Sequence, residues 1–358
     1  MKIDTITFCN TTNVGAALQE YALQKYLQLK GHEVKVVNYI PDIMTRRNSV
    51  WSVVLDSKSV HQFMKGLILL PVNVYRKAKY VIFSKRYINL TTICRETDDI
   101  KKMEQPDLFI VGSDQVWNDE LTDWRGGYFL QFNTTARKAA YAASVGKDEI
   151  SSDFMHQLRI KIQDFCGISV REKNLQEAFT AIEMPYVEQV LDPVFLLPKE
   201  HYESILKKPK IVHYVLLYEA EINENCILAA RNIAAHYDLK IVQLNRINNR
   251  YKVDQLYPCV SPTEFLGLVK YADYIVTNSF HAVAISLIME KQFWVIKLKK
   301  LFSRLESILK IADIENRVIT DHKMDFADTI NYAAVNNNLV KWKKQSMEFL
   351  DSLTGEEL

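Results

Sequence analysis

The first forty residues alternate between strand-like and helix-like patterns, and this alternation constrains the fold most strongly. An apolar run over residues 3–8 predicts a buried strand, and apolar residues at helical spacing over 14–30 predict a helix that ends at Gly31. A second apolar run over 33–39 predicts another strand, which Pro41 closes. Two strands joined through a helix pair in parallel, so the chain opens as a β-α-β unit of a parallel sheet.

The same alternation continues along the chain. Further strands are expected at 107–111, 139–143, 166–170, 187–191, 210–218, 240–244, 273–276 and 293–296. Further helices are expected at 151–165, 172–182, 223–237, 262–270, 280–289 and 325–353. A polar stretch over 199–210 with prolines near both ends separates the two series. We therefore expect an α/β protein of two Rossmann-like lobes with an intervening cleft.

These patterns also suggest the domain boundaries. The 358 residues exceed the size at which a single core usually stops growing. We expect an N-terminal lobe over 1–205, with a basic helical insertion at about 46–90, and a C-terminal lobe over 206–340. A helix over 341–358 is expected to pack back on the N-terminal lobe.

Composition excludes several classes of function. The net charge of +2 gives no sign of a nucleic-acid partner, which usually needs a strongly basic domain. The five cysteines are odd in number and widely spaced, which favours a reducing cytoplasm over disulfides or a zinc site. No cluster of metal-ligating residues and no glycine-rich dinucleotide or P-loop motif occurs, so neither a metal nor a nucleotide cofactor is expected.

One segment has an unusual charge pattern. Residues 46–87 carry nine Lys or Arg residues and a single acid, Asp56, with aromatic and aliphatic residues interleaved. One interpretation is a helical insertion with a solvated basic face. The other is an amphipathic patch that binds the inner face of the membrane, where each basic residue contributes about 1 kcal/mol, and such a patch would suit a lipid-linked substrate.

Polar residues follow the first and third predicted strands, where ligands bind in open α/β sheets. Asn13 can cap the helix that begins beside it, and Gly15 lets a ligand approach the backbone closely. Asp114 and Gln115 lie in the turn after the third strand. Asp114 can accept a proton from a sugar hydroxyl or cap the next turn, and Trp117 can stack on a sugar ring.

A second group of polar residues follows two later strands. Asn278 and Ser279 lead from a buried strand into a helix, with His281 in its first turn. Backbone N–H groups and the helix dipole favour an anion there, and His281 can donate a hydrogen bond or a proton, although a lone histidine is more often structural. Arg171 can clamp an anion, pair with Glu172, or lie in solvent.

Taken in order, these segments resemble the polysaccharide pyruvyl transferase family. The opening block is NTTNVGAALQEYALQKYLQLKGHEVKVVNYIPD, followed by DLFIVGSDQVWN. Three later blocks follow in the family order, ISVRE, VLDPVFLL and TNSFHAVAISL. The resemblance spans roughly residues 3–320 and leaves the basic insertion and the C-terminal tail outside.

The resemblance implies a GT-B-like fold and transfer of the pyruvyl group of phosphoenolpyruvate onto two hydroxyls of one sugar. The products would be a cyclic ketal and phosphate, with no cofactor beyond this co-substrate. It places His281 at the phosphoenolpyruvate and Asp114 near the acceptor sugar. As catalytic residues we expect His281 to be the acid or the partner of the phosphate, and Asp114 to be the base. The implied donor site comprises Arg171, Asn278, Ser279, His281 and Arg304. The implied acceptor site comprises Asn13, Gly15, Asp114, Gln115 and Trp117. The membrane interpretation of the basic insertion would suit an acceptor sugar carried on a lipid.

The chain departs from the family pattern beside the histidine. Ser279 stands where some members have arginine, and Ala282 stands where many have glycine. Arg304, Arg246 or Arg250 would have to supply the missing charge. Two alternatives remain open, a GT-B glycosyltransferase that uses a nucleotide sugar and a non-catalytic glycan-binding relative.

Overall fold

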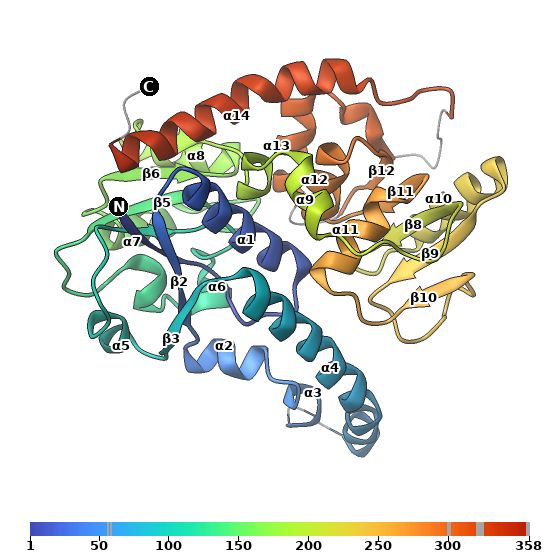
Figure 1. Cartoon of the computed structure of the whole chain (residues 1–358), viewed down its shortest axis with the longest axis horizontal. Coiled ribbons are helices and arrows are strands. Elements are labelled where there is room, and N and C mark those ends of the chain that lie inside the picture. Colours follow the sequence, from blue (N-terminus) through green and yellow to red (C-terminus); the bar gives the residue numbers. More distant parts are fainter. Residues whose placement is uncertain (56, 58, 299–301, 320–325, 356–358) are drawn as a thin grey trace. The chain divides into compact units, whose positions relative to one another are not determined.

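The computed structural model describes residues 1–55, 57, 59–298, 302–319 and 326–355. The chain forms two compact units, unit 1 with Met1–Leu197 and Trp342–Leu358, and unit 2 with Pro198–Lys341. Each unit contains its own parallel sheet with helices packed against it (Figure 1). This confirms the predicted α/β fold class.

Unit 1 is built on a seven-stranded sheet with the strand order β3-β2-β1-β4-β5-β6-β7, and every neighbouring pair is parallel. Its strands are β1 (Lys2–Ile6), β2 (Glu33–Tyr39), β3 (Leu90–Cys94), β4 (Leu108–Val111), β5 (Arg137–Ala143), β6 (Gly167–Val170) and β7 (Glu188–Gln189). The central strand β4 has the sequence LFIV, and all four side chains are buried. Helices cover both faces of a parallel sheet, so such a strand is apolar throughout.

Helices of unit 1 follow the strands in the expected positions. They are α1 (Val14–Leu29), α5 (Thr97–Lys101), α6 (Asp119–Thr122), α7 (Ser152–Lys161) and α8 (Lys173–Ala181), with short 3-10 turns η1 (Gly126–Phe129) and η2 (Pro193–Leu196). Thirteen of the residues of α1 are buried, which makes it the central helix of the unit. The chain turns back after α1 at Gly31, whose φ of +85° lies in the left-handed region that glycine adopts without strain.

Unit 2 is built on a six-stranded parallel sheet with the strand order β10-β9-β8-β11-β12-β13. Its strands are β8 (Tyr214–Tyr218), β9 (Lys240–Leu244), β10 (Gln255–Tyr257), β11 (Tyr274–Thr277), β12 (Gln292–Ile296) and β13 (Val318–Ile319). Its helices are α9 (Lys199–Ile205), α10 (Glu224–Tyr237), α11 (Pro262–Lys270), α12 (Phe280–Ile288) and α13 (Ser303–Ala312), with a 3-10 turn η3 (Glu315–Arg317). The middle strands β8 and β11 carry the polar loops considered below.

The division between the units falls just before α9, so residues 198–205 belong to unit 2 although the sequence predicted them for the N-terminal lobe. The segment after α9 lies against α11, because the Lys207 amide donates to the Thr263 carbonyl at 2.9 Å. A Cβ atom on Gly267 would come within 1.9 Å of the Lys207 carbonyl oxygen. Only glycine allows this close approach of the two backbones.

The C-terminal helix α14 (Tyr332–Thr354) contributes residues to both units. In unit 1 the Lys30 ammonium lies 2.9 Å from the Asp351 carboxylate, and the Leu191 amide donates to Ser346 Oγ at 2.9 Å. The helix was expected to begin at Asp325, which lies outside the described residues. It begins at Tyr332 in the structure.

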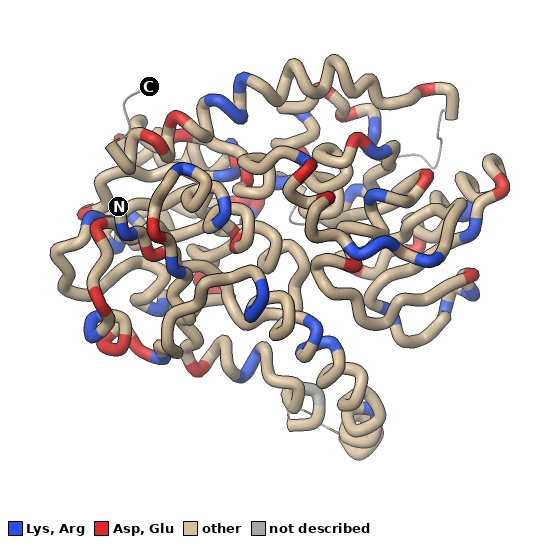
Figure 2. The backbone as a smooth tube through the Cα atoms, in the orientation of Figure 1, with Lys and Arg blue, Asp and Glu red and all other residues tan. Residues whose placement is uncertain are grey.

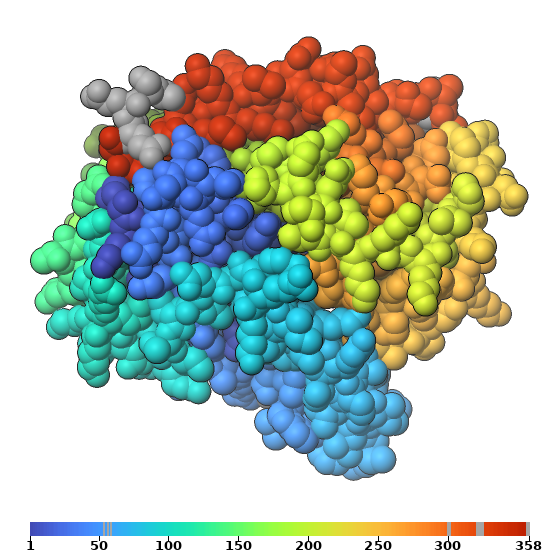
Figure 3. Space-filling view, viewed as in Figure 1, coloured from blue at the N-terminus to red at the C-terminus, as the bar shows by residue number. Residues whose placement is uncertain are grey.

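The basic insertion is helical. It consists of α2 (Asp42–Arg47), α3 (Ser52–Leu55) and the long helix α4 (Val60–Tyr87), while Asp56 and Lys58 lie outside the described residues. The first half of α4, together with α3, stands out from the rest of unit 1 (Figure 3). In the part of the chain that the structure describes, no helix is long and apolar enough to cross a membrane.

Candidate active site

The loops after β1 and β4 lie side by side because these strands are neighbours in the sheet of unit 1. Thr7, just beyond β1, donates its hydroxyl proton to the Ser113 carbonyl at 2.9 Å. Gln19 on α1 donates from Nε2 to Thr7 Oγ1 at 2.8 Å. These bonds fix the start of α1 against the turn that contains Asp114.

Asn13 and Gly15 form the beginning of α1. The Asn13 side-chain oxygen accepts hydrogen bonds from the Gly15 amide at 2.8 Å and from the Ala16 amide at 3.3 Å. Asn13 is therefore the N-cap of α1, as one of the two interpretations predicted. Its side chain is exposed to solvent, and its contact with a sugar stays a prediction.

The turn after β4 is tightly determined. Asp114 is 7% exposed and has a φ of +73°, a conformation that is uncommon outside glycine and that the surrounding contacts must hold. Its Oδ1 accepts from the Gln115 amide at 2.9 Å, and its carbonyl accepts from the Ser144 amide at 3.1 Å. The Gln115 side chain lies over Gly146, where a Cβ atom would come within 2.3 Å of it.

Trp117 lies in the core of unit 1, and the prediction that it stacks on a sugar is wrong. The side chain is 0% exposed, and its Nε1 donates to the Tyr128 carbonyl at 3.2 Å. Its ring meets Phe165 and Phe179 edge-on, with centroids 6.5 Å and 6.4 Å away. A tryptophan with a satisfied N–H gains more from burial than from solvent exposure, and the sequence alone did not reveal this.

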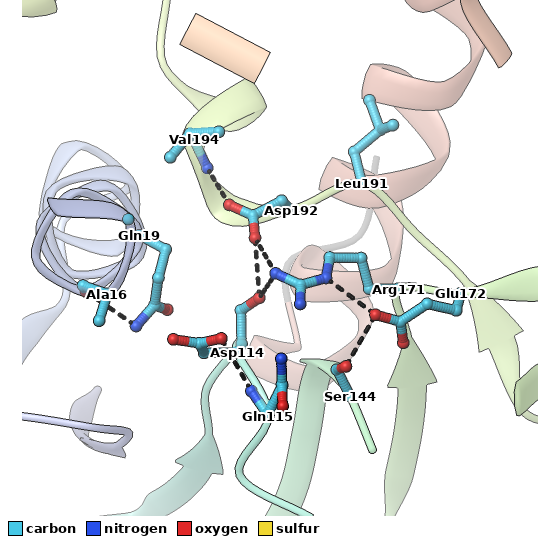
Figure 4. A network of polar contacts seen from close by, with 12 residues as sticks. Ala16, Gln19, Asp114, Gln115, Ser144, Arg171, Glu172, Leu191, Asp192 and Val194 are labelled. Atoms are coloured by element: carbon cyan, nitrogen blue, oxygen red, sulfur yellow. Dashed lines mark hydrogen bonds and ion pairs between the residues drawn. The ribbon is translucent and has the colours of Figure 1, made fainter. Parts of the chain in front are cut away.

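Arg171 sits at the centre of a buried polar network that joins four loops of unit 1 (Figure 4). Its Nη1 lies 2.6 Å from the Asp192 carboxylate, and its Nε lies 3.2 Å from Glu172. Ser113 Oγ donates to Asp192 at 3.0 Å, and Ser144 Oγ donates to Glu172 at 2.7 Å. The side chains of Arg171, Glu172 and Asp192 are each no more than 3% exposed, so both ion pairs are buried.

This arrangement corrects the prediction that Arg171 clamps the donor. Burial alone would lower the pKa of Arg171, but the carboxylates of Glu172 and Asp192 outweigh it and raise that pKa. The guanidinium is therefore already neutralised by protein groups. Pairing with Glu172 was one predicted alternative. The sequence analysis did not single out Asp192. A usable signal was the Asp-Pro pair in VLDPVFLL, which directly follows the strand predicted at 187–191.

Glu20 is a second buried acid that the sequence reasoning missed. Its side chain projects from α1, is 5% exposed, and its Oε1 has no hydrogen-bond partner among the described residues. Burial raises the pKa of Glu20 to about 8. An acid within the apolar stretch of α1 was the available signal, because such a residue faces the core if the helix is buried.

In unit 2, the loop after β11 is held by Asn278. Its Oδ1 accepts from the Ala220 amide at 2.7 Å, and its Nδ2 donates to the Glu221 carbonyl at 2.7 Å. Both ends of the side-chain amide are thus used to fix the loop after β8. Asn278 therefore positions its neighbours, and its contact with the donor stays a prediction.

His281 lies in the first turn of α12 and is 8% exposed. Ser279 is the N-cap residue of this helix, but its side chain makes no capping hydrogen bond. The Ser279 amide donates to Thr277 Oγ1 at 3.0 Å, which orients the turn. A histidine, a serine hydroxyl and the positive end of a helix dipole therefore lie within three residues of one another.

Three arginines were expected to supply the charge missing beside His281. Arg246 lies 3.8 Å from the buried Glu219 carboxylate, and Arg250 lies 2.6 Å from Glu224. Arg304 lies in the first turn of α13, a helix that packs against α12, and its side chain is half-buried. Arg246 and Arg250 thus have acidic partners, and the role of Arg304 beside the donor stays a prediction.

The sequence of the chain also matches a known protein family. The sequence matches the family model for polysaccharide pyruvyl transferase over residues 13–299, most of the chain. The chain belongs to the polysaccharide pyruvyl transferase family. No curated protein matches it significantly in sequence.

Solved structures similar to this family member show its fold. One is a protein from Listeria monocytogenes described as a UDP-N-acetylglucosamine 2-epimerase, 12% identical, with 99% of this chain and 89% of that chain covered and a TM-score of 0.50. Another is S. aureus MnaA in a co-structure with UDP, 14% identical, with 95% and 87% covered and a TM-score of 0.50. These similarities confirm the GT-B-like fold.

No group of three or more His, Cys, Asp or Glu residues is arranged to hold a metal ion within the described ranges.

The buried ion pairs predict a large effect of removing Arg171. Arg171→Ala leaves two carboxylates buried without their cation, so we expect the free energy of unfolding to fall by about 3–5 kcal/mol. Chemical denaturation measures this change. Lys173→Ala, which removes an exposed cation nearby, should change it by less than about 0.5 kcal/mol. Equal effects of the two substitutions would contradict a buried network.

The raised pKa of Glu20 predicts that stability falls as the pH rises. The folded protein keeps this proton up to about pH 8, whereas the unfolded chain loses it near the ordinary glutamate pKa. The free energy of unfolding should therefore decline between these values by up to about 1.4 kcal/mol per pH unit. Glu20→Gln should remove this decline at pH 6.5 to 8, as measured by urea denaturation at several pH values.

A second buried acid provides the matched control. Burial raises the pKa of Asp4 to about 6, so Asp4→Asn should change the pH dependence only below about pH 6. A Glu20→Gln variant whose stability still declines from pH 6.5 to 8 as steeply as that of the original chain would disprove the assignment to Glu20.

Proposed function

We propose that the chain transfers the pyruvyl group of phosphoenolpyruvate onto two hydroxyls of a sugar in a polysaccharide or glycan precursor. The products are a cyclic ketal and inorganic phosphate. Family membership supports the reaction class. The observation that carries the proposal is the position of His281 in the first turn of α12, beside an N-cap residue whose hydroxyl does not cap the helix.

The proposed chemistry needs an acid and a base. A proton added to the methylene carbon of phosphoenolpyruvate makes the adjacent carbon electrophilic, and one sugar hydroxyl adds to it. The phosphate then leaves as the second hydroxyl closes the ketal. Of the two hydroxyl protons lost, one balances the new methyl group and the other leaves with phosphate.

The proposed roles fall on residues of the loops described above. In unit 2, His281 acts as the acid or as a donor to the phosphate, with Ser279 and Arg304 as further donors. In unit 1, Asp114 acts as the base for the sugar hydroxyls, and the loop that begins at Asn13 contacts the sugar. Phosphoenolpyruvate is a co-substrate, and the proposed reaction needs no cofactor.

Helix α4 supports a further part of the proposal, that the acceptor is carried on a lipid at the inner face of the membrane. An exposed apolar stripe runs along it at helical spacing, formed by Val60, Phe63, Met64, Leu67, Ile68, Val74, Tyr75 and Ile82. The helix carries six Lys or Arg residues and no acid (Figure 2). Apolar residues flanked by cations favour an anionic lipid surface, and a second copy of so basic a helix would be repelled.

Replacing His281 tests the proposed donor site. His281→Ala should lower the rate of phosphoenolpyruvate-dependent phosphate release by about 10²–10⁴-fold, because a positioned acid contributes roughly that factor. Phosphate release in the presence of the acceptor glycan measures it. His156→Ala, at an exposed position on α7, is the control and should leave the rate unchanged. A near-normal rate in His281→Ala would refute the assignment.

Donor choice is tested by thermal stabilisation. Phosphoenolpyruvate should raise the melting temperature, because a ligand that binds only the folded state stabilises it. Stabilisation by nucleotide sugars alone would favour the glycosyltransferase alternative. Stabilisation by neither would favour a non-catalytic glycan-binding protein.

Membrane association is tested by co-sedimentation with vesicles of anionic phospholipid. Ile68→Glu removes a 72% exposed apolar group from the α4 stripe and adds a negative charge, so we expect severalfold weaker sedimentation. Ile160→Glu makes the same change at a 67% exposed position on α7 and should sediment normally. Equal binding by the two variants would contradict a role for α4.

A further inference from the structure

A pocket in unit 1 adjoins the loop that begins α1 and extends between α1 and α4. It has a volume of about 280 Å³ and lies between α1, α4, β2 and the edge strand β3. Its walls are mostly apolar and include Ile40, Val81, Phe83 and Leu90, while Glu20 and Lys77 supply charge-bearing groups. A mixed lining of this kind is typical of small-molecule sites, in which a few polar groups orient a largely apolar ligand.

Glu20 supplies a buried carboxyl oxygen that is available to a ligand. Its side chain is 95% buried, and its Oε1 has no hydrogen-bond partner in the part of the chain that the structure describes. A buried oxygen without a partner costs free energy, so a ligand that bonded to it would recover that cost. Because burial favours the protonated form, Glu20 can donate a hydrogen bond and does not repel an anion.

Lys77 supplies the cation of the pocket. Its ammonium donates to the backbone carbonyl of Asn10, a residue that also lines the pocket. Cys9 lies beside Lys77, and Glu20, Tyr80 and Lys85 are the other titratable groups of the lining. Burial lowers the pKa of Lys77, which the neighbouring Cys9 opposes. Burial raises the pKa of Cys9 and of Glu20, so both are neutral near pH 7. Lys85 adds a second, exposed cation to the lining. The pocket therefore carries a net positive charge, which suits an anion.

The helix that carries the exposed stripe, α4, also forms an apolar wall of the pocket. Val81 lines the pocket, and the next residue, Ile82, is 64% exposed in the stripe. A phosphate ion alone would leave the walls formed by Ile40, Phe83 and Leu90 in contact with water or empty space. Filling such a site with apolar groups is favourable by about 25 cal/mol for each Å² removed from water.

We propose that this pocket binds a lipid phosphate, with the apolar chain between α1 and α4 and the phosphate between Lys77 and Glu20. This inference rests on the proposed function, because a lipid-linked acceptor would present such a group. Asn10 and Thr11 line the pocket and precede Asn13 and Gly15 on the same loop. A head group attached to the phosphate would thus extend along the loop proposed to contact the sugar. Bulk anionic phospholipid carries the same chemistry and is the second source.

The test measures the binding of decyl phosphate, below its micelle concentration and without phosphoenolpyruvate, by isothermal titration calorimetry. Two matched probes serve as controls. Decanol lacks the charge, and inorganic phosphate lacks the apolar chain. We expect decyl phosphate to bind at least tenfold more tightly than either, because both parts of the pocket contribute. Equal affinity for decyl phosphate and inorganic phosphate would overturn the proposal, as would the absence of binding.

Two variants and one control locate the site. Val81→Trp fills the pocket and should abolish binding, whereas Ile160→Trp makes the same kind of change at a 67% exposed position on α7 and should bind normally. Lys77→Met removes the charge and should weaken decyl phosphate by about 10- to 100-fold while leaving decanol unchanged. Unaltered decyl phosphate binding in Val81→Trp would overturn the proposal even if Lys77→Met failed to fold.

Two activity measurements then separate the sources. If the ligand is the carrier of the acceptor, Val81→Trp should lose turnover of a lipid-linked acceptor and keep turnover of the same sugar without lipid. If the ligand is bulk phospholipid, the variant should lose vesicle binding and keep both turnovers. Because the binding measurement needs no turnover, failure of the proposed reaction would be visible separately, as absent turnover of both acceptors by the original chain.

Discussion

The buried guanidinium of Arg171 is the constraint on which the rest of unit 1 depends. It joins β6 to the loop after β7 through Asp192, and the hydroxyls of Ser113 and Ser144 connect the loops after β4 and β5 to the same cluster. A charge buried this deeply is tolerable only when its partners are in place, so the four loops must fold together. The left-handed turn at Asp114 is held within this framework.

Most of the fold could be predicted from the sequence, because prolines, glycines and capping residues mark where the buried strands and helices begin and end. The segments Glu33–Tyr39 and Pro262–Lys270 were predicted with their observed bounds, since Pro41 closes one and Ser261 caps the other. The edge strands β3, β10 and β13 were not predicted. They have two to five residues and are only partly buried, so their sequences lack a clear apolar pattern. The strand expected at 187–191 is reduced to two paired residues.

The positions of the polar residues at the ends of strands were predicted more successfully than the contacts of their side chains. The carboxyl ends of β1, β4 and β11 carry Asn13, Asp114 and His281, because a parallel sheet places its polar loops at one edge. The burial of Trp117 and the ion pairs of Arg171 depend on segments distant in sequence, which local patterns do not reveal. Glu20 was missed for the same reason, since its isolation depends on how α4 covers α1. No sequence motif predicted the pocket that Glu20 lines.

These observations describe a GT-B-like member of the polysaccharide pyruvyl transferase family, for which we propose transfer from phosphoenolpyruvate to a lipid-carried sugar. The most direct test incubates the protein with a lipid-linked oligosaccharide and phosphoenolpyruvate labelled separately in its pyruvyl carbons and its phosphorus. The account predicts a glycan heavier by pyruvic acid less one water, containing the carbon label, with the phosphorus label released as inorganic phosphate in equal amount. A glycan that carries the phosphorus label, or one that stays unmodified while a nucleotide sugar is consumed, would contradict it.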